Sequence, residues 1–506
     1  MKTMKSLYSF VVLALTALVF TACSDSTNFL YQDVDAPKIL SFGFYEEDNP
    51  EFLSSDHVVD LSGRIVSGTS TVSVDVPLPS TVDKSSLIAR FTTSDGAVVK
   101  VNGVEQTSQS TANNFKIPVD YIVSKGSLNV RYAVTVTKGT NMKWLEAPAF
   151  ADLTVFGDPV MKINPQTHEP YVGFKVRTDN DYRPVVIKLT DNGWEYVGSG
   201  PFGNKISSSY FDMDLNADGV PFVGYSDNTA STSGALTVQD FTNGTWQFTG
   251  GSAGVLNAQS NYLGIAVLAN GEIVGAQVNN STKSDYVRRT LVVSNYKDGG
   301  WTSQTPSMLT NLVYMSNVAG GSKAAYVISI NRGMVSGVNC GYNVLKYENG
   351  EWTAMILNYL EPGNTPNFNN ISTIGVYVAP DETPYIWTLD DASGAAAIRM
   401  KYYDSTTDSW LTLGGNVLPL GFAPDRHTEV ALAVTNDGTP YIVYNNLADQ
   451  GYPYFMYLDQ ETQQWSSPVK IADISATGLS IGFAKTGVGY VTFTDDSSKV
   501  RIFKYE

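Results

Sequence analysis

The chain has 506 residues, a formal net charge of −16 and a sequence pI near 4.7. Such an acidic chain lacks the basic footprint that binding to nucleic acid or anionic lipid headgroups requires, so neither partner is expected. With 16% charged residues, 12% aromatic residues and 43 glycines, the composition is that of a turn-rich globular protein, and the length suggests at least two domains.

Residues 1–22 have the pattern of an export signal. Two lysines precede an apolar run at 7–20, which is too short for a mature membrane span but fits the hydrophobic segment of a signal peptide. The run ends in Thr-Ala-Cys at Cys23, and this resembles a bacterial lipoprotein signal, in which the cysteine becomes the lipidated N-terminus. The resemblance implies lipidation of Cys23 and an outer-membrane location facing the cell exterior. The alternative is an ordinary secretory signal with a coincidental cysteine.

Residues 23–36 are small and polar, and we interpret them as a tether. The acidic stretch after Cys23 is similar to that of surface lipoproteins of the Bacteroides group. The only other cysteine in the sequence is Cys340. If Cys23 is acylated, the chain has no intramolecular disulfide. No base is adjacent to Cys340, so we interpret it as a loop residue rather than a nucleophile.

Residues 37–139 predict a separate β domain. Alternating apolar and polar residues mark strands at ILSFGF, HVVDLSGRIV, TVSVDVPLP, LIARFTT, AVVKVNG and LNVRYAVTVTKG. Six or seven strands in about 100 residues, without a long helical period, fit an immunoglobulin-like sandwich. The order of these strands is similar to that in the small N-terminal domains of Bacteroides surface lipoproteins. In that family such domains are spacers or docking modules, and this chain resembles such a lipoprotein with a second, larger β domain.

Residues 140–506 contain a repeat that ends in a turn and a tryptophan. The tryptophans at 194, 246, 301, 352, 410 and 465 lie 52, 55, 51, 58 and 55 residues apart. A second-strand pattern such as PYVGF recurs in step with them, at residues 170, 221, 272, 325, 384, 440 and 489. The stretch 210–250 reads as four short strands joined by DG and NG turns. Seven such units predict a seven-bladed β-propeller, with the tryptophans packed between blades.

The seventh unit ends in its third strand, VRIFKYE, at residues 500–506. We expect the missing fourth strand to come from MKWLEAP, which carries Trp144 and precedes the first unit. A blade shared between the two ends of the propeller would close the ring and remove exposed strand edges.

Antiparallel connectivity places the loops on two different faces of this propeller. The turns between first and second strands and between third and fourth strands are tight, and they share one face. The loops between second and third strands and the blade connections share the other face and are long, above all at 279–289, 331–342, 358–373 and 414–428. Variable loops on a rigid scaffold are where binding usually occurs, so we expect the site on this long-loop face.

Asp and Asn follow the second strands in five of the seven units. We expect them to ring the mouth of the central channel, although Asp and Asn at strand ends also often bind their own turn. The candidate ligand-binding residues are Arg177, Asp227, Asn331, Arg332, Asp390, Asp391, Asn446 and Asp495. Aromatic residues on the same loops are candidate platforms for sugar rings: Tyr182, Tyr286, Tyr342, Tyr359, Phe368, Phe422, Tyr452 and Tyr454.

No cofactor is expected. Asp214, Asn216 and Asp218 with Gly219 match the opening of a Ca²⁺ loop, but position 12 is Tyr225 and the other units lack the ligand set. A plain β-turn is therefore the favoured interpretation. The three histidines show no zinc spacing.

Catalysis has less support than binding, and no catalytic residue can be named. The turn-plus-tryptophan hairpins resemble the Asp-box turns of sialidases, but the spacing of glycine and tryptophan differs. The arginine triad that this resemblance implies cannot be identified. A carboxylate pair of the glycosidase kind cannot be located by spacing either. We therefore expect a lipid-anchored binding protein for an extended, neutral carbohydrate, since an acidic ring would repel a polyanion. A sialidase-like propeller hydrolase and a protein–protein scaffold remain as alternatives, and partner proteins of a surface uptake complex are further candidate partners.

Overall fold

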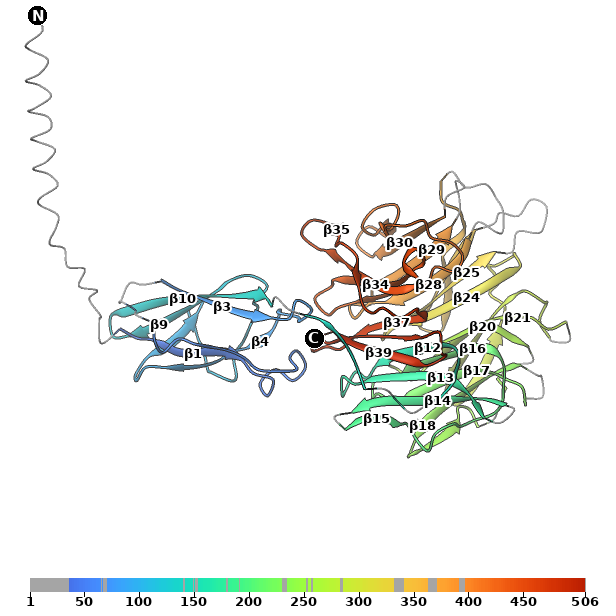
Figure 1. Ribbon diagram of the computed structural model, residues 1–506, viewed down its shortest axis with the longest axis horizontal. Helices are drawn as coiled ribbons and strands as arrows, with labels where there is room; N and C mark the ends of the chain where they lie inside the picture. Colours follow the sequence, from blue (N-terminus) through green and yellow to red (C-terminus); the bar gives the residue numbers. More distant parts are fainter. Residues whose placement is uncertain are drawn as a thin grey trace, which may run out of the picture. The chain divides into compact units, whose positions relative to one another are not determined.

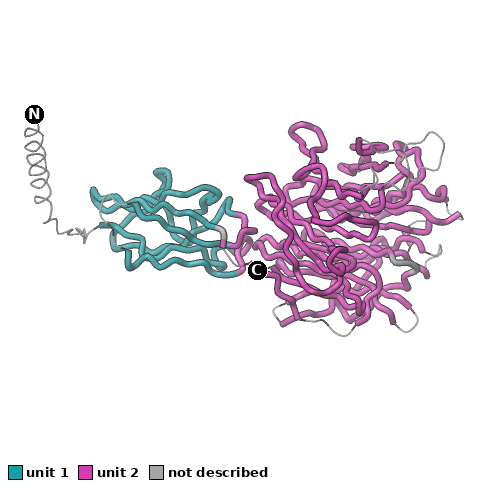
Figure 2. The backbone as a smooth tube through the Cα atoms, turned by 45° about the horizontal axis from the view of Figure 1, so that its top comes forward, with its two compact units in different colours: residues 1–49, 55–78, 84–137 teal, residues 50–54, 79–83, 138–506 magenta. Residues whose placement is uncertain are grey.

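The structure of the protein is a computed structural model that describes residues 36–505. Within that range it leaves out residues 65, 67–70, 140–141, 149, 151–152, 179–180, 191, 230–233, 252–253, 256–257, 283–284, 332–340, 363–370 and 391–395. The chain forms two compact units (Figure 2). Unit 1 comprises residues 1–49, 55–78 and 84–137, and unit 2 comprises residues 50–54, 79–83 and 138–506. Among the described residues no helix is long and apolar enough to cross a bilayer.

Unit 1 consists of β-strands in a three-stranded sheet (β2-β1-β5), a five-stranded sheet (β3-β10-β9-β6-β7) and a short pair (β4-β8). The strands are β1 (Ile39–Phe44), β2 (His57–Asp60), β3 (Thr71–Leu78), β4 (Leu87–Ile88), β5 (Arg90–Thr93), β6 (Val98–Val101), β7 (Val104–Glu105), β8 (Ala112–Asn113), β9 (Val119–Lys125) and β10 (Leu128–Lys138).

Aromatic side chains fill the space between the two larger sheets of unit 1. Phe42 of β1 contacts Tyr121 of β9 edge-on at 5.1 Å, and the hydroxyl of Tyr132 in β10 accepts a hydrogen bond from the Ile39 amide. Two sheets therefore pack face to face. Strand β9 was not among the predicted strands, although its alternation of buried and half-buried residues is clear. The predicted strand LIARFTT is two strands, β4 and β5, which belong to different sheets.

Unit 2 contains seven sheets, drawn from green to red in Figure 1, which we number as blades 1–7. Blades 1–3 are β12 (Val155–Ile163), β13 (Pro170–Thr178), β14 (Asp181–Thr190), β15 (Gly193–Tyr196); β16 (Ile206–Leu215), β17 (Pro221–Asp227), β18 (Ala235–Thr242), β19 (Thr245–Phe248); and β20 (Ser260–Val267), β21 (Ile273–Asn279), β22 (Leu291–Lys297), β23 (Gly300–Gln304).

Blades 4–6 follow the same order of strands. They are β24 (Val313–Gly320), β25 (Ala324–Asn331), β26 (Tyr342–Glu348), β27 (Glu351–Tyr359); β28 (Ile371–Val378), β29 (Pro384–Asp390), β30 (Ala397–Asp404), β31 (Ser409–Thr412); and β32 (Val430–Val434), β33 (Pro440–Asn446), β34 (Tyr452–Asp459), β35 (Gln464–Trp465), with β36 (Val469–Lys470) added beside β34.

Blade 7 joins the two ends of the propeller. It consists of β37 (Thr477–Phe483), β38 (Gly489–Thr494) and β39 (Val500–Tyr505), completed by β11 (Trp144–Glu146). Trp144 pairs with Tyr505 and its ring stacks on that side chain at 4.8 Å. The first strand of each blade contacts the first strands of both neighbouring blades, all the way round the ring. The predicted seven-bladed propeller closed by an N-terminal strand is therefore confirmed.

The repeated tryptophans connect neighbouring blades, as predicted. The indole of Trp246 in blade 2 donates to the carbonyl of Val197 after blade 1, and Trp301 in blade 3 donates to Thr249 after blade 2. Glycines sit beneath these rings. A Cβ on Gly250, whose φ is +86°, would lie 2.8 Å from the Trp301 ring. Glycine is required there because it allows both the positive φ and the close approach.

The inner edges of the first strands are covered by side chains from the preceding blade. Asp212 accepts a hydrogen bond from the Ile265 amide at 2.8 Å, and Asn317 accepts one from Val376 at 3.2 Å. Ser480 of blade 7 accepts one from Met161 of blade 1. These contacts satisfy edge amides that would otherwise face the axis unpaired.

Candidate functional site

The first strands of the seven blades, rather than the second strands, surround the propeller axis. They contact one another round the ring, and each begins on the long-loop face. The mouth of the channel on that face is therefore built by the first residues of β12, β16, β20, β24, β28, β32 and β37. The residues after the second strands, which we expected to ring this mouth, lie one strand behind the first strands in every sheet.

A register shift occurs near the loop-face end of the first strand in six of the seven blades. The shifts fall at 156–160, 206–211, 261–264, 313–315, 371–373 and 477–480. Such β-bulges release residues from the regular alternation and re-aim their side chains, and they are frequent beside functional sites. Here they lie together around the mouth.

Three tyrosines in these bulges form one side of the mouth, and we call Tyr210, Tyr262 and Tyr314 the tyrosine arc. They belong to blades 2, 3 and 4. The ring centres of Tyr210 and Tyr262 are 4.8 Å apart, and those of Tyr262 and Tyr314 are 5.7 Å apart. All three side chains are half-buried. Burial and contact with its two neighbours raise the pKa of Tyr262, so its hydroxyl stays protonated.

Tyr262 adopts a left-handed backbone conformation, with φ of 48°. For a bulky side chain this conformation is a genuine outlier and costs free energy of about 1–3 kcal/mol. Strain of this kind persists where the surrounding structure enforces it, and it clusters at functional sites. The strained residue is the middle member of the arc, which contacts both other tyrosines.

Acidic residues form the opposite side of the mouth. Glu429, just before β32, uses Oε2 to accept hydrogen bonds from the amides of Gly478 and Leu479, at 2.5 and 3.3 Å. Asp158 in the bulge of β12 lies against Gly478, since a Cβ on that glycine would be 2.9 Å from the Asp158 Cβ. Glu429 before blade 6 and Asp158 of blade 1 therefore approach the same glycine of blade 7.

The surroundings of these two acids raise the pKa of both. Burial raises the pKa of Glu429 to about 7, and the nearby charge of Asp158 raises it further. Asp158 is exposed, but nearby protein partly desolvates its carboxyl group and raises its pKa as well, against the effect of Lys175. Burial lowers the pKa of Lys175 to about 8. Glu429 therefore carries less negative charge near neutral pH than an exposed glutamate would.

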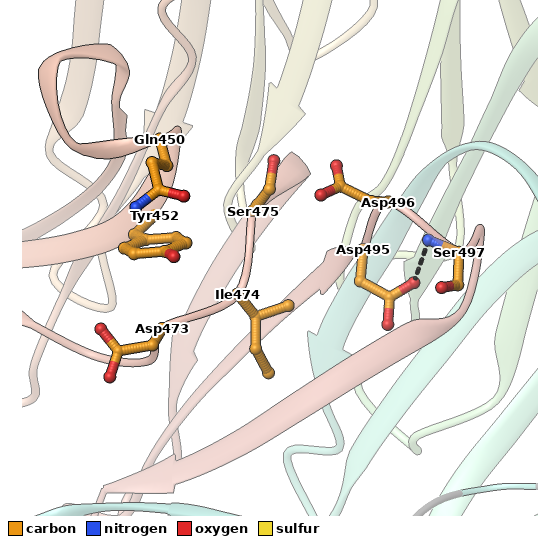
Figure 3. Close-up of a pocket in the computed structure, with 8 residues that line it drawn as sticks. All are labelled: Gln450, Tyr452, Asp473, Ile474, Ser475, Asp495, Asp496 and Ser497. Carbon is orange, nitrogen blue, oxygen red and sulfur yellow. Dashed lines mark hydrogen bonds between the residues drawn. The ribbon is translucent and has the colours of Figure 1, made fainter.

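Two hollows lie on the long-loop face beside the acidic side of the mouth. The larger has a volume of about 430 Å³ and is lined by the starts of the first strands of blades 5, 6 and 7, including Thr373, Glu429 and Thr477. The smaller has a volume of about 290 Å³ and lies between the loops of blades 6 and 7. Asp473, Asp495 and Asp496 line it (Figure 3).

Among the predicted site residues, Asp227 and Asn331 are buried and hold their own loops. Asp227 is 0% exposed and accepts hydrogen bonds from Asn204, Thr237 and the Thr229 amide. Asn331 is 1% exposed, donates to Asn358 and accepts from Asn343. Their positions assign them a structural role on the loop face, and direct ligand contact by either stays a prediction.

The other described Asp and Asn residues of the set, Asp390, Asn446 and Asp495, also bind local groups. Asp390 is 1% exposed and forms an ion pair with Arg399 at 3.1 Å. Asn446 caps the short 3₁₀ helix η2 (Leu447–Asp449) by accepting from the Ala448 amide. Asp495 accepts from the Ser497 and Lys499 amides and from Arg501, and it lines the smaller hollow (Figure 3).

Arg177 is exposed at the end of β13. Arg332, Asp391, Phe368 and the lipidation candidate Cys23 lie outside the described residues.

Three of the described aromatic platforms pack against the protein. Tyr342 is 1% exposed and presents no face to solvent. The ring of Tyr359 is covered by the Lys401 ammonium group at 4.0 Å, and Phe422 stacks beside Tyr444 at 6.1 Å. Both are half-buried, so a ligand role for Tyr359 and Phe422 stays a prediction.

The residues of the suggested Ca²⁺ loop have other contacts. Asn216 accepts hydrogen bonds from the amides of Asp218 and Val220, which is the geometry of a turn. Asp214 pairs with Lys162 at 3.1 Å and accepts from the Val267 amide in the next blade. No cluster of three or more metal-ligating side chains occurs among the described residues.

Comparison with known proteins gives one family match. Residues 54–136 match the family described as SGBP, N-terminal, where SGBP denotes surface glycan-binding protein. The match covers only the first β domain. No curated protein matches the sequence.

Solved β-propeller structures resemble much of the chain at low sequence identity. A PL25 ulvan lyase, a polysaccharide lyase solved with a bound -[GlcA(1-4)Rha3S]- fragment, is 13% identical, covers 71% of this chain and 95% of its own, and has a TM-score of 0.47. The propeller domain of the trilobed protease of Pyrococcus furiosus is 10% identical over 70% of this chain and 96% of its own, with a TM-score of 0.40. The lectin of Aleuria aurantia, solved with Fucα1-6GlcNAc, is 15% identical. The match covers 58% of this chain and 90% of the lectin chain, with a TM-score of 0.38.

Proposed function

We propose that this protein is a cell-surface, lipid-anchored glycan-binding protein whose propeller binds an extended carbohydrate across the long-loop mouth of its channel. The observation that carries the proposal is the tyrosine arc, in which three blades each offer a tyrosine at the same place on the innermost strand. The match of residues 54–136 to the N-terminal domain of surface glycan-binding proteins supports the same class of ligand.

Tyrosine suits such a site for physical reasons. Its ring offers a flat apolar surface and its hydroxyl a hydrogen-bonding group, and fixing its two torsions costs little entropy. A row of three follows the curve of the mouth, so successive sugar units of a chain can each meet one ring. Loops on this face fix the surroundings through buried residues such as Asp227 and Asn331, which leaves the mouth preorganised.

The anchor completes the proposal. The signal-like segment ending at Cys23 would hold the protein at the outer membrane, and residues 23–36 would act as the tether. The propeller would then be presented to polysaccharide outside the cell. Partner proteins of a surface uptake complex fit this arrangement.

The direct test is isothermal titration with neutral oligosaccharides of six units (gluco-, manno-, galacto- and xylo-) and with uronate-bearing and sulfated glycans. We expect binding of a neutral member. Replacing Tyr210 or Tyr314 with alanine should weaken it about 2- to 10-fold, the loss of one aromatic contact of about 0.5–1.5 kcal/mol. Tyr262→Ala should weaken it more, because it contacts both neighbours.

The matched control is Tyr403→Ala. Tyr403 lies near the end of β30 on the tight-turn face and binds Asp408 there. Its loss should leave affinity unchanged. If no glycan binds, or if Tyr403→Ala lowers affinity while the arc variants do not, the proposed site is wrong. Product analysis after long incubation would show sugar cleavage if the protein were a hydrolase.

A further inference from the structure

The acidic side of the mouth holds one carboxyl group in a defined position, that of Glu429. Glu429 enters the larger hollow from the connection before β32. Its Oε2 is held by the two amides of the β37 bulge, Gly478 and Leu479. Its backbone amide donates to Asn445, whose own amide group donates to the carbonyls of His427 and Ala476. The carboxyl group is therefore fixed in position before any ligand arrives.

The second oxygen of Glu429 is the one available to a ligand. The two amides occupy Oε2, whereas Oε1 accepts no hydrogen bond from the described residues. Oε1 is also not one of the buried polar atoms left without a partner, so it is accessible from the hollow. Amides can only donate, so Oε2 accepts whether the acid is charged or neutral. Any proton on this carboxyl group therefore resides on Oε1, which can then donate to a ligand.

Burial and the facing carboxyl group of Asp158 oppose the anion of Glu429. Asp158 faces it from β12 across Gly478, and Lys175 of β13 lies beside Asp158. Arg426 and His427 of its own connection line the hollow, and their side chains bind each other at 3.3 Å. Strand β37 contributes only the uncharged Gly478 and Leu479 here, and β33 contributes the uncharged Asn445.

Resting on the proposed function, we infer that Glu429 is the polar anchor of the glycan site and binds a neutral sugar in its protonated form, donating a hydrogen bond from Oε1 to a sugar oxygen. A neutral sugar that covers the hollow removes water from the carboxyl group and offers no countercharge. Both effects penalise the anion, so the ligand and a proton bind together. The inference names the ligand class, a neutral glycan, and the residue that selects for it.

Linkage gives the sign of the effect. Since the free group has a raised pKa of about 7, the free protein is largely protonated below that pH and largely charged above it. Binding raises the pKa further, so affinity is highest below pH 7 and falls as the pH rises. The slope approaches tenfold per pH unit when one proton is taken up per glycan. We expect affinity at least about tenfold weaker at pH 8.5 than at pH 6.5.

The experiment titrates the wild type with its best-binding neutral hexasaccharide from the panel at pH 5.5, 6.5, 7.5 and 8.5. At pH 7.5 the titration is repeated in buffers of different ionisation enthalpy, which measures the protons taken up. Glu429→Gln should keep the affinity of the wild type at low pH and lose both the pH dependence and the proton uptake. Its amide oxygen can still accept from Gly478 and Leu479 while its NH₂ group replaces the O–H donor.

Two further variants test whether the pH dependence comes from Glu429. Asp158→Asn removes the facing charge and should shift the midpoint of the pH profile to lower values. Glu351→Gln changes an exposed carboxyl group at the tight-turn side of β27 and should leave the profile unchanged. If Glu429→Gln does not fold, the shift caused by Asp158→Asn still decides the matter.

The outcomes separate the two proposals. If no glycan binds at any pH, the proposed function itself fails. If a neutral glycan binds the wild type with a flat pH profile, or Glu429→Gln keeps the wild-type slope, the role of Glu429 is refuted while the proposed function stands. Loss of binding at every pH in a stably folded Glu429→Gln would show that the charged carboxylate is required. That result also refutes the proposed role of protonated Glu429.

Discussion

Replacing Trp144 with alanine should open the propeller at blade 7. Trp144 stacks on Tyr505 at 4.8 Å and meets Phe455 at 5.4 Å, and each aromatic pair contributes about 0.5–1.5 kcal/mol. The indole is half-buried, so the loss should stay below the 3–5 kcal/mol of a fully buried tryptophan. We expect a loss of about 2–4 kcal/mol in the free energy of unfolding.

Urea unfolding followed by fluorescence measures this loss as a lower midpoint with an unchanged slope. Hydrogen exchange should then accelerate in β37, β38 and β39 as well as in β11, because the four strands share one ladder. The neighbouring Leu145 is 49% exposed, so Leu145→Ala should change stability by less than about 0.5 kcal/mol. Equal stabilities of the two variants, or faster exchange in β11 alone, would show that this strand does not close the ring.

Cys23→Ala should release the protein from the membrane fraction, and unchanged membrane attachment would argue against lipidation. Asp227→Ala should lower stability by about 1–3 kcal/mol, because it leaves buried donors unpaired, and calorimetry would show this without any ligand. Tyr262→Gly should destabilise less than Tyr314→Gly in the same assay, since glycine relieves the strain at φ 48°; a larger loss at Tyr262 would contradict this. Burial raises the folded pKa of Glu429 from 4.5 to about 7, so the folded state binds the extra proton and this stability is lost as pH rises from 4.5 through 7. Between pH 4.5 and 7, the difference in the free energy of unfolding between the wild type and Glu429→Gln should therefore shrink as the pH rises. A difference that stays constant over this range would show that the pKa of Glu429 is not raised in the folded state.

The propeller could be predicted because its repeat leaves three independent marks in the sequence. The second-strand pattern and the terminal tryptophan recur in every complete unit, and tight DG or NG turns occur in most of them. Each of these marks has a local physical cause. Closure followed from counting strands, since an unpaired third strand at VRIFKYE needs a partner. Strand β9 in unit 1 belongs to no repeat and is marked only by its alternating residues, so it was not predicted from the sequence.

The site was harder to predict because its geometry depends on which strand faces the axis. Asp and Asn after the second strands are candidate ligand-binding residues by their chemistry, yet their side chains bind groups of their own loops, as Asp227 does. The tyrosine arc left a signal that could have been found. Its members recur every 52 residues, at 210, 262 and 314, just before the second-strand pattern.

The acidic side of the mouth left no comparable signal in the sequence. Asp158 and Glu429 are far apart in the chain and meet only through the bulge at Gly478.

The sharing of blade 7 between β11 and β37–β39 also sets the order in which the protein can mature. A ribosome that has made β11 must still make six complete blades before its partner strand exists. At about 5–20 residues per second that interval is on the order of tens of seconds. During it, β11 has no ladder to join and the nascent propeller keeps two open edges. Ring closure therefore requires the last strand of the chain, and a chain truncated before Val500 would lack the partner strand of β11 however well its earlier blades had folded.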